Sequence, residues 1–199
     1  MRFDDSYSAL ERRLLPLVRR SAATMWTPAI ATLVRFNISP HVVSASQLAW
    51  AVLFWVAVLP QPRVALAAFV LALLMDSLDG ALARATGRSG AFGALVDQLS
   101  DHTREAMIVA ALASAGVLHV GLAVLYAFIY PAFNFILFLS NRVGVPVPVT
   151  IKTLFLFYPT IVAYLGFGVN LLDFGIGLAL LSMLISGAFA LVRLRRAMT

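Results

Sequence analysis

Long stretches without a charged residue alternate with short charged segments along this chain. None of Asp, Glu, Lys or Arg occurs in residues 36–62, 64–75, 106–141, 153–172 or 174–192. A helix crosses the hydrocarbon core of a bilayer with about 20 apolar residues, so the stretch 106–141 is long enough for two crossings. The pattern predicts six membrane-spanning helices, at about residues 41–60, 64–84, 92–117, 120–140, 152–168 and 172–192.

The composition supports a membrane protein. The chain has 199 residues, of which 61% are hydrophobic and only 12% are charged, whereas about a quarter of the residues in a typical soluble domain are charged. Because the strict alternation of transmembrane strands is absent, we expect an all-α, polytopic membrane helical bundle. The chain has no cysteine, which excludes a thiolate nucleophile, a cysteine-ligated zinc site and a disulfide.

The positions of the basic residues predict the orientation. With six crossings, nearly all of them fall on one side, and Arg63 is the clear exception. By the positive-inside rule that side is the cytoplasm, so we expect a multi-pass protein of the plasma membrane with both termini in the cytoplasm. The net charge of +6 then reflects topology and attraction to anionic lipid, and it does not indicate a nucleic-acid partner.

The segment before the first expected span has a different pattern. Leu10, Leu14 and Leu17 fall near one helical face opposite pairs of arginines, and Pro16 interrupts the middle. This pattern is typical of a kinked amphipathic helix at the membrane surface. We therefore expect two parts, a cytoplasmic interfacial segment at 1–35 and a six-helix membrane domain at 36–199.

Four of the nine acidic residues lie near the cytoplasmic ends of the second and third expected spans. Asp76 and Asp79 are three positions apart, and Asp97 and Asp101 are four apart, so each pair shares a helix face. The short connection makes the two spans antiparallel neighbours, and the pairs can then face each other across a small cavity open to the cytoplasm. Such oxygen ligands suit Mg²⁺ or Mn²⁺ rather than zinc or copper, and four carboxylates suffice for two ions.

Small and basic residues accompany these carboxylates. Gly80 and Ala83 remove side-chain bulk beside them, and Arg84 and Arg88 add positive charge, as binding of a diphosphate requires. Metal ions held by carboxylates next to arginines are typical of phosphoryl transfer. No Gly-rich GKS/T loop is present, so the sequence does not support a Walker-type ATP site.

The same residues form a known signature. The segment 76–101 matches DxxDGxxARx₈GxxxDxxxD at every fixed position, and thus resembles the CDP-alcohol phosphotransferase (CDP-alcohol phosphatidyltransferase) family. The signature consists of Asp76, Asp79, Gly80, Ala83, Arg84, Gly93, Asp97 and Asp101.

The resemblance implies an enzyme that transfers a phosphatidyl group from CDP-diacylglycerol to an alcohol and releases CMP. It implies that Asp76, Asp79 and Asp97 bind two divalent ions, and that Asp101 is both a ligand of the second ion and the general base. The expected residues of the CDP pocket are Gly80, Ala83, Arg84 and Gly93, together with Arg88 on account of its charge.

One segment departs from the family pattern. Many members carry Pro-Asn-x-x-Thr before the first span, where it contacts the nucleotide, whereas this chain has Pro40, His41 and Ser44 at the fixed positions. Ser44 keeps a hydroxyl group and is a candidate nucleotide contact. His41 is either a contact or an interfacial residue at the start of the span.

The acceptor alcohol is indicated by only a few basic residues. Lys152-Thr153 resembles the Lys-Thr pair of phosphatidylglycerophosphate and cardiolipin synthases of the family. A phosphorylated acceptor suits Arg104, Arg142 and Lys152, and glycerol 3-phosphate is our first choice, with inositol phosphate as the alternative. Two roles are open for Arg104, because it either binds the acceptor phosphate or pairs with Asp101 or Glu105.

A second class of function also uses aspartates within the membrane, namely metal- or proton-coupled transport. Transporters more often hold them near the bilayer midplane on broken helices, whereas here they gather at the cytoplasmic ends beside arginines. The sequence therefore favours the enzyme. By resemblance to the family we also expect a homodimer.

Overall fold

The computed structural model describes residues 7–151 and 153–198, which form helices joined by turns and loops, without strands. The helices are α1 (Ala9–Arg35), α2 (Pro40–Ala57), α3 (Pro62–Ala85), α4 (Ala91–Ser114), α5 (Val120–Arg142), α6 (Thr153–Leu156), α7 (Tyr158–Phe167) and α8 (Leu172–Met198). The expected all-helical class is confirmed.

Four of the six expected spans are present as helices long and apolar enough to cross a membrane, namely α2, α3, α5 and α8. Helix α4 has the expected length, but its middle carries four charged residues, Asp97, Asp101, Arg104 and Glu105. The fifth expected span, at 152–168, is divided into α6 and α7. Pro159 explains this break, because it has no N–H to continue the helical hydrogen bonds of α6.

The N-terminal segment is a single helix. Helix α1 includes Pro16 and Pro28, so Pro16 does not end it. Ser8 and Glu11 cap its first turn reciprocally, since the Ser8 N–H donates to Glu11 Oε2 at 2.8 Å and the Glu11 N–H donates to Ser8 Oγ at 3.4 Å. Leu10, Leu14 and Leu17 are exposed, as an interfacial helix requires, and the interfacial location stays a prediction.

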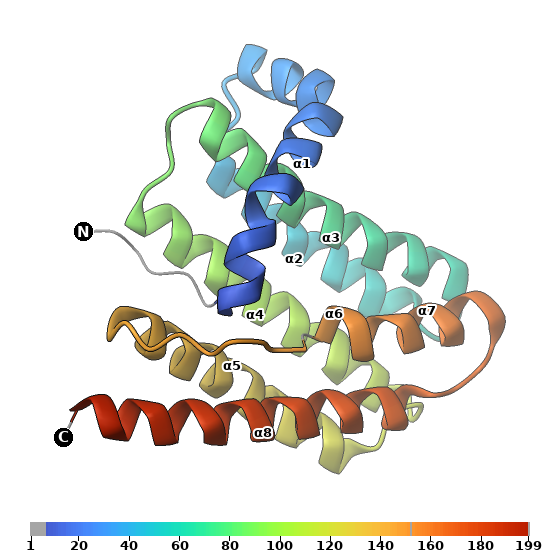
Figure 1. Cartoon of the computed structure of the whole chain (residues 1–199). Coiled ribbons are helices and arrows are strands. Elements are labelled where there is room, and N and C mark those ends of the chain that lie inside the picture. The colour runs from blue at the N-terminus through green and yellow to red at the C-terminus, as the bar shows by residue number, and fades with distance from the viewer. Residues whose placement is uncertain (1–6, 152, 199) are drawn as a thin grey trace. The chain divides into compact units, whose positions relative to one another are not determined.

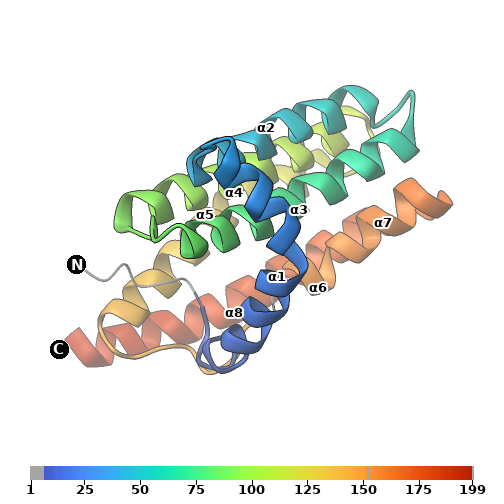
Figure 2. The same ribbon diagram turned by 90° about the horizontal axis from the view of Figure 1, so that it is seen from above.

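The chain divides into two compact units, which are described separately. Of the described residues, unit 1 contains Leu15–Ile108, and unit 2 contains 7–14 and those from Val109 to 198. In unit 1, α2 and α3 form a hairpin and lie side by side (Figures 1 and 2). Phe54 of α2 and Phe69 of α3 meet with ring centroids 6.2 Å apart. The small residues of the two helices that are fully buried are Ala51, Ala65, Ala68 and Ala72.

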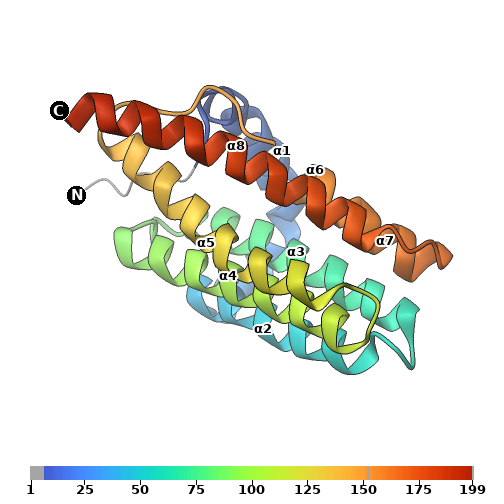
Figure 3. The ribbon, with the colours of Figure 1, turned by 90° about the horizontal axis from the view of Figure 1, so that it is seen from below.

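The C-terminal half of α1 packs on the same hairpin. Trp26, Ile30 and Leu33 contact a buried cluster of Val43, Leu78 and Leu82, which come from α2 and α3. In unit 2, α5 packs along α8 (Figure 3). There Tyr126 is fully buried, and its hydroxyl lies 3.0 Å from Thr153 Oγ1.

Candidate active site

A tight turn in unit 1 brings the signature residues of α3 and α4 together. Helix α3 ends at Ala85, and the next residue, Thr86, caps it by donating its N–H to the Leu82 carbonyl at 2.9 Å. Gly87 follows with φ of 66°, and the Arg88 N–H donates back to the Ala83 carbonyl at 2.9 Å. A glycine adopts this left-handed conformation without strain, so the chain reverses here and α4 begins at Ala91.

Three of the four signature aspartates form one group. Asp76 of α3 and Asp97 and Asp101 of α4 each offer a carboxylate oxygen, and these oxygens all lie within 4.8 Å of one another. All three side chains are half-buried. Like charges this close repel each other unless a cation lies between them. The oxygen-only donor set and its spacing therefore fit a hard divalent cation such as Mg²⁺ or Mn²⁺.

The fourth aspartate lies beside this group and has a different environment. Asp79 is only 3% exposed, and its Oδ2 accepts a hydrogen bond of 3.5 Å from Nε2 of Gln47 on α2. Asp79 is not part of the group of three carboxylates whose oxygens lie within 4.8 Å of one another. Its role as a metal ligand stays a prediction.

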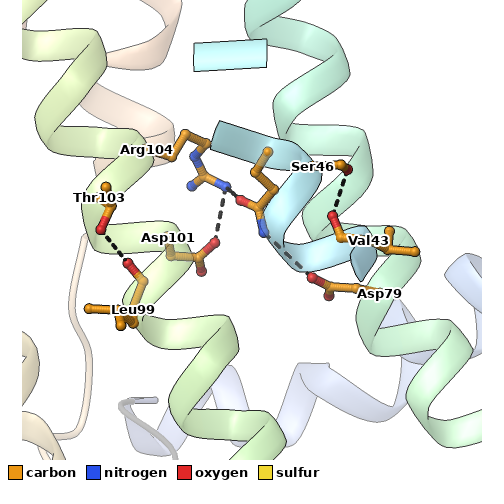
Figure 4. A network of polar contacts seen from close by, with 8 residues as sticks. Val43, Ser46, Asp79, Leu99, Asp101, Thr103 and Arg104 are labelled. Atoms are coloured by element: carbon orange, nitrogen blue, oxygen red, sulfur yellow. Dashed lines mark hydrogen bonds and ion pairs between the residues drawn. The ribbon is translucent and has the colours of Figure 1, made fainter. Parts of the chain in front are cut away.

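Arg104 is buried behind Asp101. It is 3% exposed, and its Nη1 donates to Asp101 Oδ1 at 3.0 Å and also to Gln47 Oε1 (Figure 4). Of the two roles left open by the sequence, the structure shows the pairing with Asp101. The guanidinium group holds one oxygen of that carboxylate in place and partly balances the negative charge of the group.

Gln47 is the residue of this network that the sequence reasoning missed. Its side chain is fully buried and joins α2 to both signature helices. The available signal was a lone amide in an apolar helix, three positions after Ser44 and therefore on the same face. Trp26 was missed as well, although its Nε1–H donates to Ser77 Oγ at 3.0 Å, one residue from Asp76.

The expected nucleotide residues surround the turn between α3 and α4. A Cβ atom added to Gly80 would lie 3.2 Å from Arg84 Nη1, so the arginine side chain folds back over this glycine. A Cβ atom on Gly93 would lie 3.3 Å from Cε1 of His41, so Gly93 allows α2 to approach α4 closely. Arg84 and Arg88 are exposed, as binding of an anionic ligand from solution requires.

The other expected ligand-binding residues have varied surroundings. Ala83 is half-buried next to the turn. Ser44 is buried and its hydroxyl donates to the Pro40 carbonyl at 3.2 Å. Arg142 is exposed at the last position of α5, in unit 2, and Lys152 lies outside the described residues.

Comparisons with known proteins agree with the fold and the signature. Residues 22–192 match the family model described as CDP-alcohol phosphatidyltransferase. The chain is similar to the crystal structure of Mycobacterium tuberculosis phosphatidylinositol phosphate synthase with CDP-DAG bound, at 19% identity and a TM-score of 0.67, over 84% of this chain and 92% of that one.

A second structure of the same mycobacterial enzyme, in complex with manganese and citrate, matches at 19% identity with a TM-score of 0.66, over 84% of this chain and 88% of that one. The search of curated proteins found no match. The likeness to the solved structures establishes the fold, and the family model, which covers most of the sequence, establishes the class. The chain therefore belongs to the CDP-alcohol phosphatidyltransferase family.

Proposed function

We propose that this membrane phosphatidyltransferase transfers the phosphatidyl group of CDP-diacylglycerol to the hydroxyl group of a small phosphorylated alcohol. Membership of the family gives the enzyme class. The observation that carries the transferase proposal is the group formed by Asp76, Asp97 and Asp101, whose oxygens lie within 4.8 Å of one another. The basic residues discussed below support the acceptor.

Divalent cations complete this site. Asp76, Asp97 and Asp101 would hold the first, and Asp79 with Asp101 would contribute to a second. When bound, Mg²⁺ or Mn²⁺ neutralises the diphosphate and the charge that develops on the leaving group. The manganese complex of the mycobacterial enzyme supports this assignment.

Asp101 is the proposed general base. It accepts the proton of the acceptor hydroxyl while that oxygen forms a bond to the lipid-bearing phosphorus, and the bond from this phosphorus to the CMP oxygen breaks. CMP then leaves with the bonding electron pair. The ion pair with Arg104 supports this role, because a base must be held in a fixed orientation to reach its proton.

The nucleotide and its diphosphate would lie over the turn between α3 and α4. Arg84 and Arg88 are exposed cations there and would pair with phosphate oxygens. Gly80, Ala83 and Gly93 keep the surrounding helix surfaces free of bulk. Ser44 would contribute its hydroxyl group from α2 after exchanging its present bond to the Pro40 carbonyl.

The acceptor phosphate would be bound by basic residues outside the carboxylate group. Arg104 is committed to Asp101 and Gln47, which leaves Arg142 and Lys152 as the proposed contacts. Their charges suit a phosphorylated alcohol, with glycerol 3-phosphate ahead of inositol phosphate. The Lys152-Thr153 pair supports this order.

The proposed setting is the plasma membrane, with the site and both termini on the cytoplasmic side. The four helices long enough to cross a membrane support a multi-pass protein, and the distribution of basic residues supports the orientation. A homodimer is proposed from the family alone.

CMP release from CDP-diacylglycerol tests the proposal. Purified protein in detergent receives Mg²⁺ or Mn²⁺ and one acceptor at a time, namely glycerol 3-phosphate, inositol phosphate, inositol or serine. We expect release with a phosphorylated acceptor and none after chelation. Asp173→Asn is the matched control, because Asp173 accepts the His119 N–H at 2.8 Å in unit 2, and asparagine can do the same. Release only with inositol or serine would contradict the proposed acceptor.

A further inference from the structure

Gln47 lies between two groups of opposite charge. On one side its Oε1 accepts from Nη1 of Arg104, and on the other its Nε2 donates to Oδ2 of Asp79 at 3.5 Å (Figure 4). The side chain is fully buried, as are most atoms of its two partners. The amide thus links α3, α2 and α4 at the level of the carboxylate group.

An amide is the side chain that this position requires. A guanidinium group only donates hydrogen bonds and an ionised carboxylate only accepts them, so the residue between them must accept at one end and donate at the other. A glutamate here would place a second carboxylate against Asp79, and a lysine would place a second cation against Arg104. Burial makes either alternative costly, because an unbalanced charge is poorly stabilised away from water.

The Arg104 atom that Gln47 holds is also the atom that orients Asp101. Nη1 of Arg104 donates both to Gln47 and to Asp101 Oδ1, the latter at 3.0 Å. Gln47, on α2, holds the Arg104 guanidinium group in place, and this guanidinium group holds one oxygen of Asp101 in place. The carboxylate then presents its remaining lone pairs in a defined direction.

We propose that Gln47 is a positioning residue of the transferase, which acts through Arg104 to set the orientation of Asp101. This inference rests on the proposed function for its catalytic consequence. Gln47 touches neither substrate nor reacting atoms in this scheme. It makes the ion pair on α4 depend on a residue of α2, outside the signature segment.

The test compares two substitutions of Gln47 with a neighbouring control. Gln47→Met keeps the length of the side chain and removes both hydrogen bonds. Gln47→Glu keeps the acceptor for Arg104 and removes the donor to Asp79. Ser46→Ala is the control, because the Ser46 hydroxyl donates at 2.6 Å to the Val43 carbonyl of its own helix.

Kinetics give the first measurement. For Gln47→Met we expect kcat to fall about 10- to 100-fold, the size of effect that a misplaced catalytic group produces, with KM for CDP-diacylglycerol within about twofold. The kcat of Gln47→Glu should fall less than that of Gln47→Met, since a glutamate still accepts the hydrogen bond from Arg104. The kcat of Ser46→Ala should equal that of the wild type. A kcat of the Met variant equal to the wild type, or an equal loss in the Met and Glu variants, would overturn the proposal.

Manganese binding, measured by electron paramagnetic resonance of free Mn²⁺, gives a measurement that needs no turnover. Partners behind metal ligands typically contribute about 10- to 100-fold to metal affinity, so we expect the Kd for Mn²⁺ to rise by about tenfold in Gln47→Met. In an Arg104→Met background, Gln47→Met should cause no further rise, because its route to Asp101 is already cut. A further rise in the Kd for Mn²⁺ in the double variant would show that Gln47 acts independently of Arg104 and would overturn the proposal.

These two measurements also separate this inference from the function on which it rests. If the wild type releases no CMP with any acceptor but binds Mn²⁺, the proposed function fails while the binding data still decide the role of Gln47. If the wild type neither turns over nor binds Mn²⁺, both fail. A cooperative thermal unfolding transition of each variant well above the assay temperature, in detergent with chelator, excludes misfolding as the cause of a loss.

Discussion

The two units of this chain use their polar side chains in different ways. In unit 2 they satisfy helix ends and loops: Asn141 donates to the Tyr7 carbonyl at 3.0 Å, and Arg193 donates to the Pro146 carbonyl at 2.8 Å. Asp173 accepts the His119 N–H at the start of α5. Each of these contacts joins a donor to a complementary acceptor, as expected of interactions that stabilise a fold.

In unit 1 the carboxylates of Asp76, Asp97 and Asp101 are instead grouped with one another. The buried guanidinium of Arg104 balances only part of that charge. Grouping like charges in a half-buried place works against folding, so a benefit other than stability must explain it. The comparison separates polar residues that serve the fold from those that serve the reaction, and it predicts that the two sets respond differently to substitution.

The largest expected effect is the loss of turnover in Asp101→Asn. An amide cannot take the proton of the acceptor hydroxyl, and general-base catalysis contributes about 10²- to 10⁴-fold. We therefore expect kcat for CMP release to fall by about that factor. CDP-diacylglycerol binding, measured on the same preparation, should be largely kept, and Asp173→Asn should turn over like the wild type. Normal turnover of Asp101→Asn would exclude this residue as the base.

The next largest effect is expected on the thermal stability of Asp76→Asn, measured with and without a bound metal ion. An asparagine there removes one of three mutually repelling charges, so with chelator present the apparent Tm of Asp76→Asn should equal or exceed that of the wild type. Ligand binding at about 100 times Kd stabilises a folded protein by about 2.7 kcal/mol. Mn²⁺ should give the wild type a gain of this order and the variant much less, as measured by thermal unfolding in detergent.

The opposite pattern would place Asp76 among the residues that serve the fold. A variant with a lower Tm in chelator and an undiminished response to Mn²⁺ would contradict its role as a ligand and remove the contrast between the two units.

The grouping of three of the four signature aspartates could be predicted from the sequence because both determinants are local. Spacings of three and four on helices, with a short connection, are enough to bring Asp76, Asp97 and Asp101 together. The sequence could not show whether Arg104 pairs with Asp101 or binds a phosphate, because an arginine three positions after an aspartate is compatible with both. Gln47 could not be placed because its partners depend on which face of α2 packs against α3 and α4.

The division of the fifth span shows another limit of sequence reasoning. An uninterrupted apolar stretch predicts one long helix, and Pro159 alone did not decide whether that helix would kink or end. In the structure α6 ends at Leu156 and α7 starts at Tyr158. Packing contributes here, because Gly175 of α8 allows the Leu156 carbonyl and Thr160 to approach closely on either side of the break.

That close approach predicts a smaller effect in unit 2. A Cβ atom on Gly175 would lie 2.6 Å from Thr160 Oγ1 and 3.0 Å from the Leu156 carbonyl oxygen. Gly175→Ala should therefore destabilise the protein by about 1–3 kcal/mol, the usual cost of overpacking, and lower its apparent Tm. Gly177→Ala is the matched control, because nothing lies within 4 Å of its added Cβ atom, and alanine favours the helix by about 0.5–1 kcal/mol. A higher Tm for both variants would contradict the packing of α8 on α6 and α7.

The smallest expected effect is on stability within unit 1, at the contact between Trp26 and Ser77. Trp26→Phe removes the hydrogen bond of 3.0 Å and keeps the aromatic ring in the cluster with Val43 and Leu78. A neutral hydrogen bond contributes about 0.5–1.5 kcal/mol, so the apparent Tm should fall by a correspondingly small amount while kcat stays unchanged. Ser77→Ala should cause a similar fall, and the double variant should be no worse than either single one, since both remove the same bond. A loss of kcat in Trp26→Phe without a loss of Tm would instead assign α1 a part in the reaction, because Ser77 adjoins Asp76 on α3.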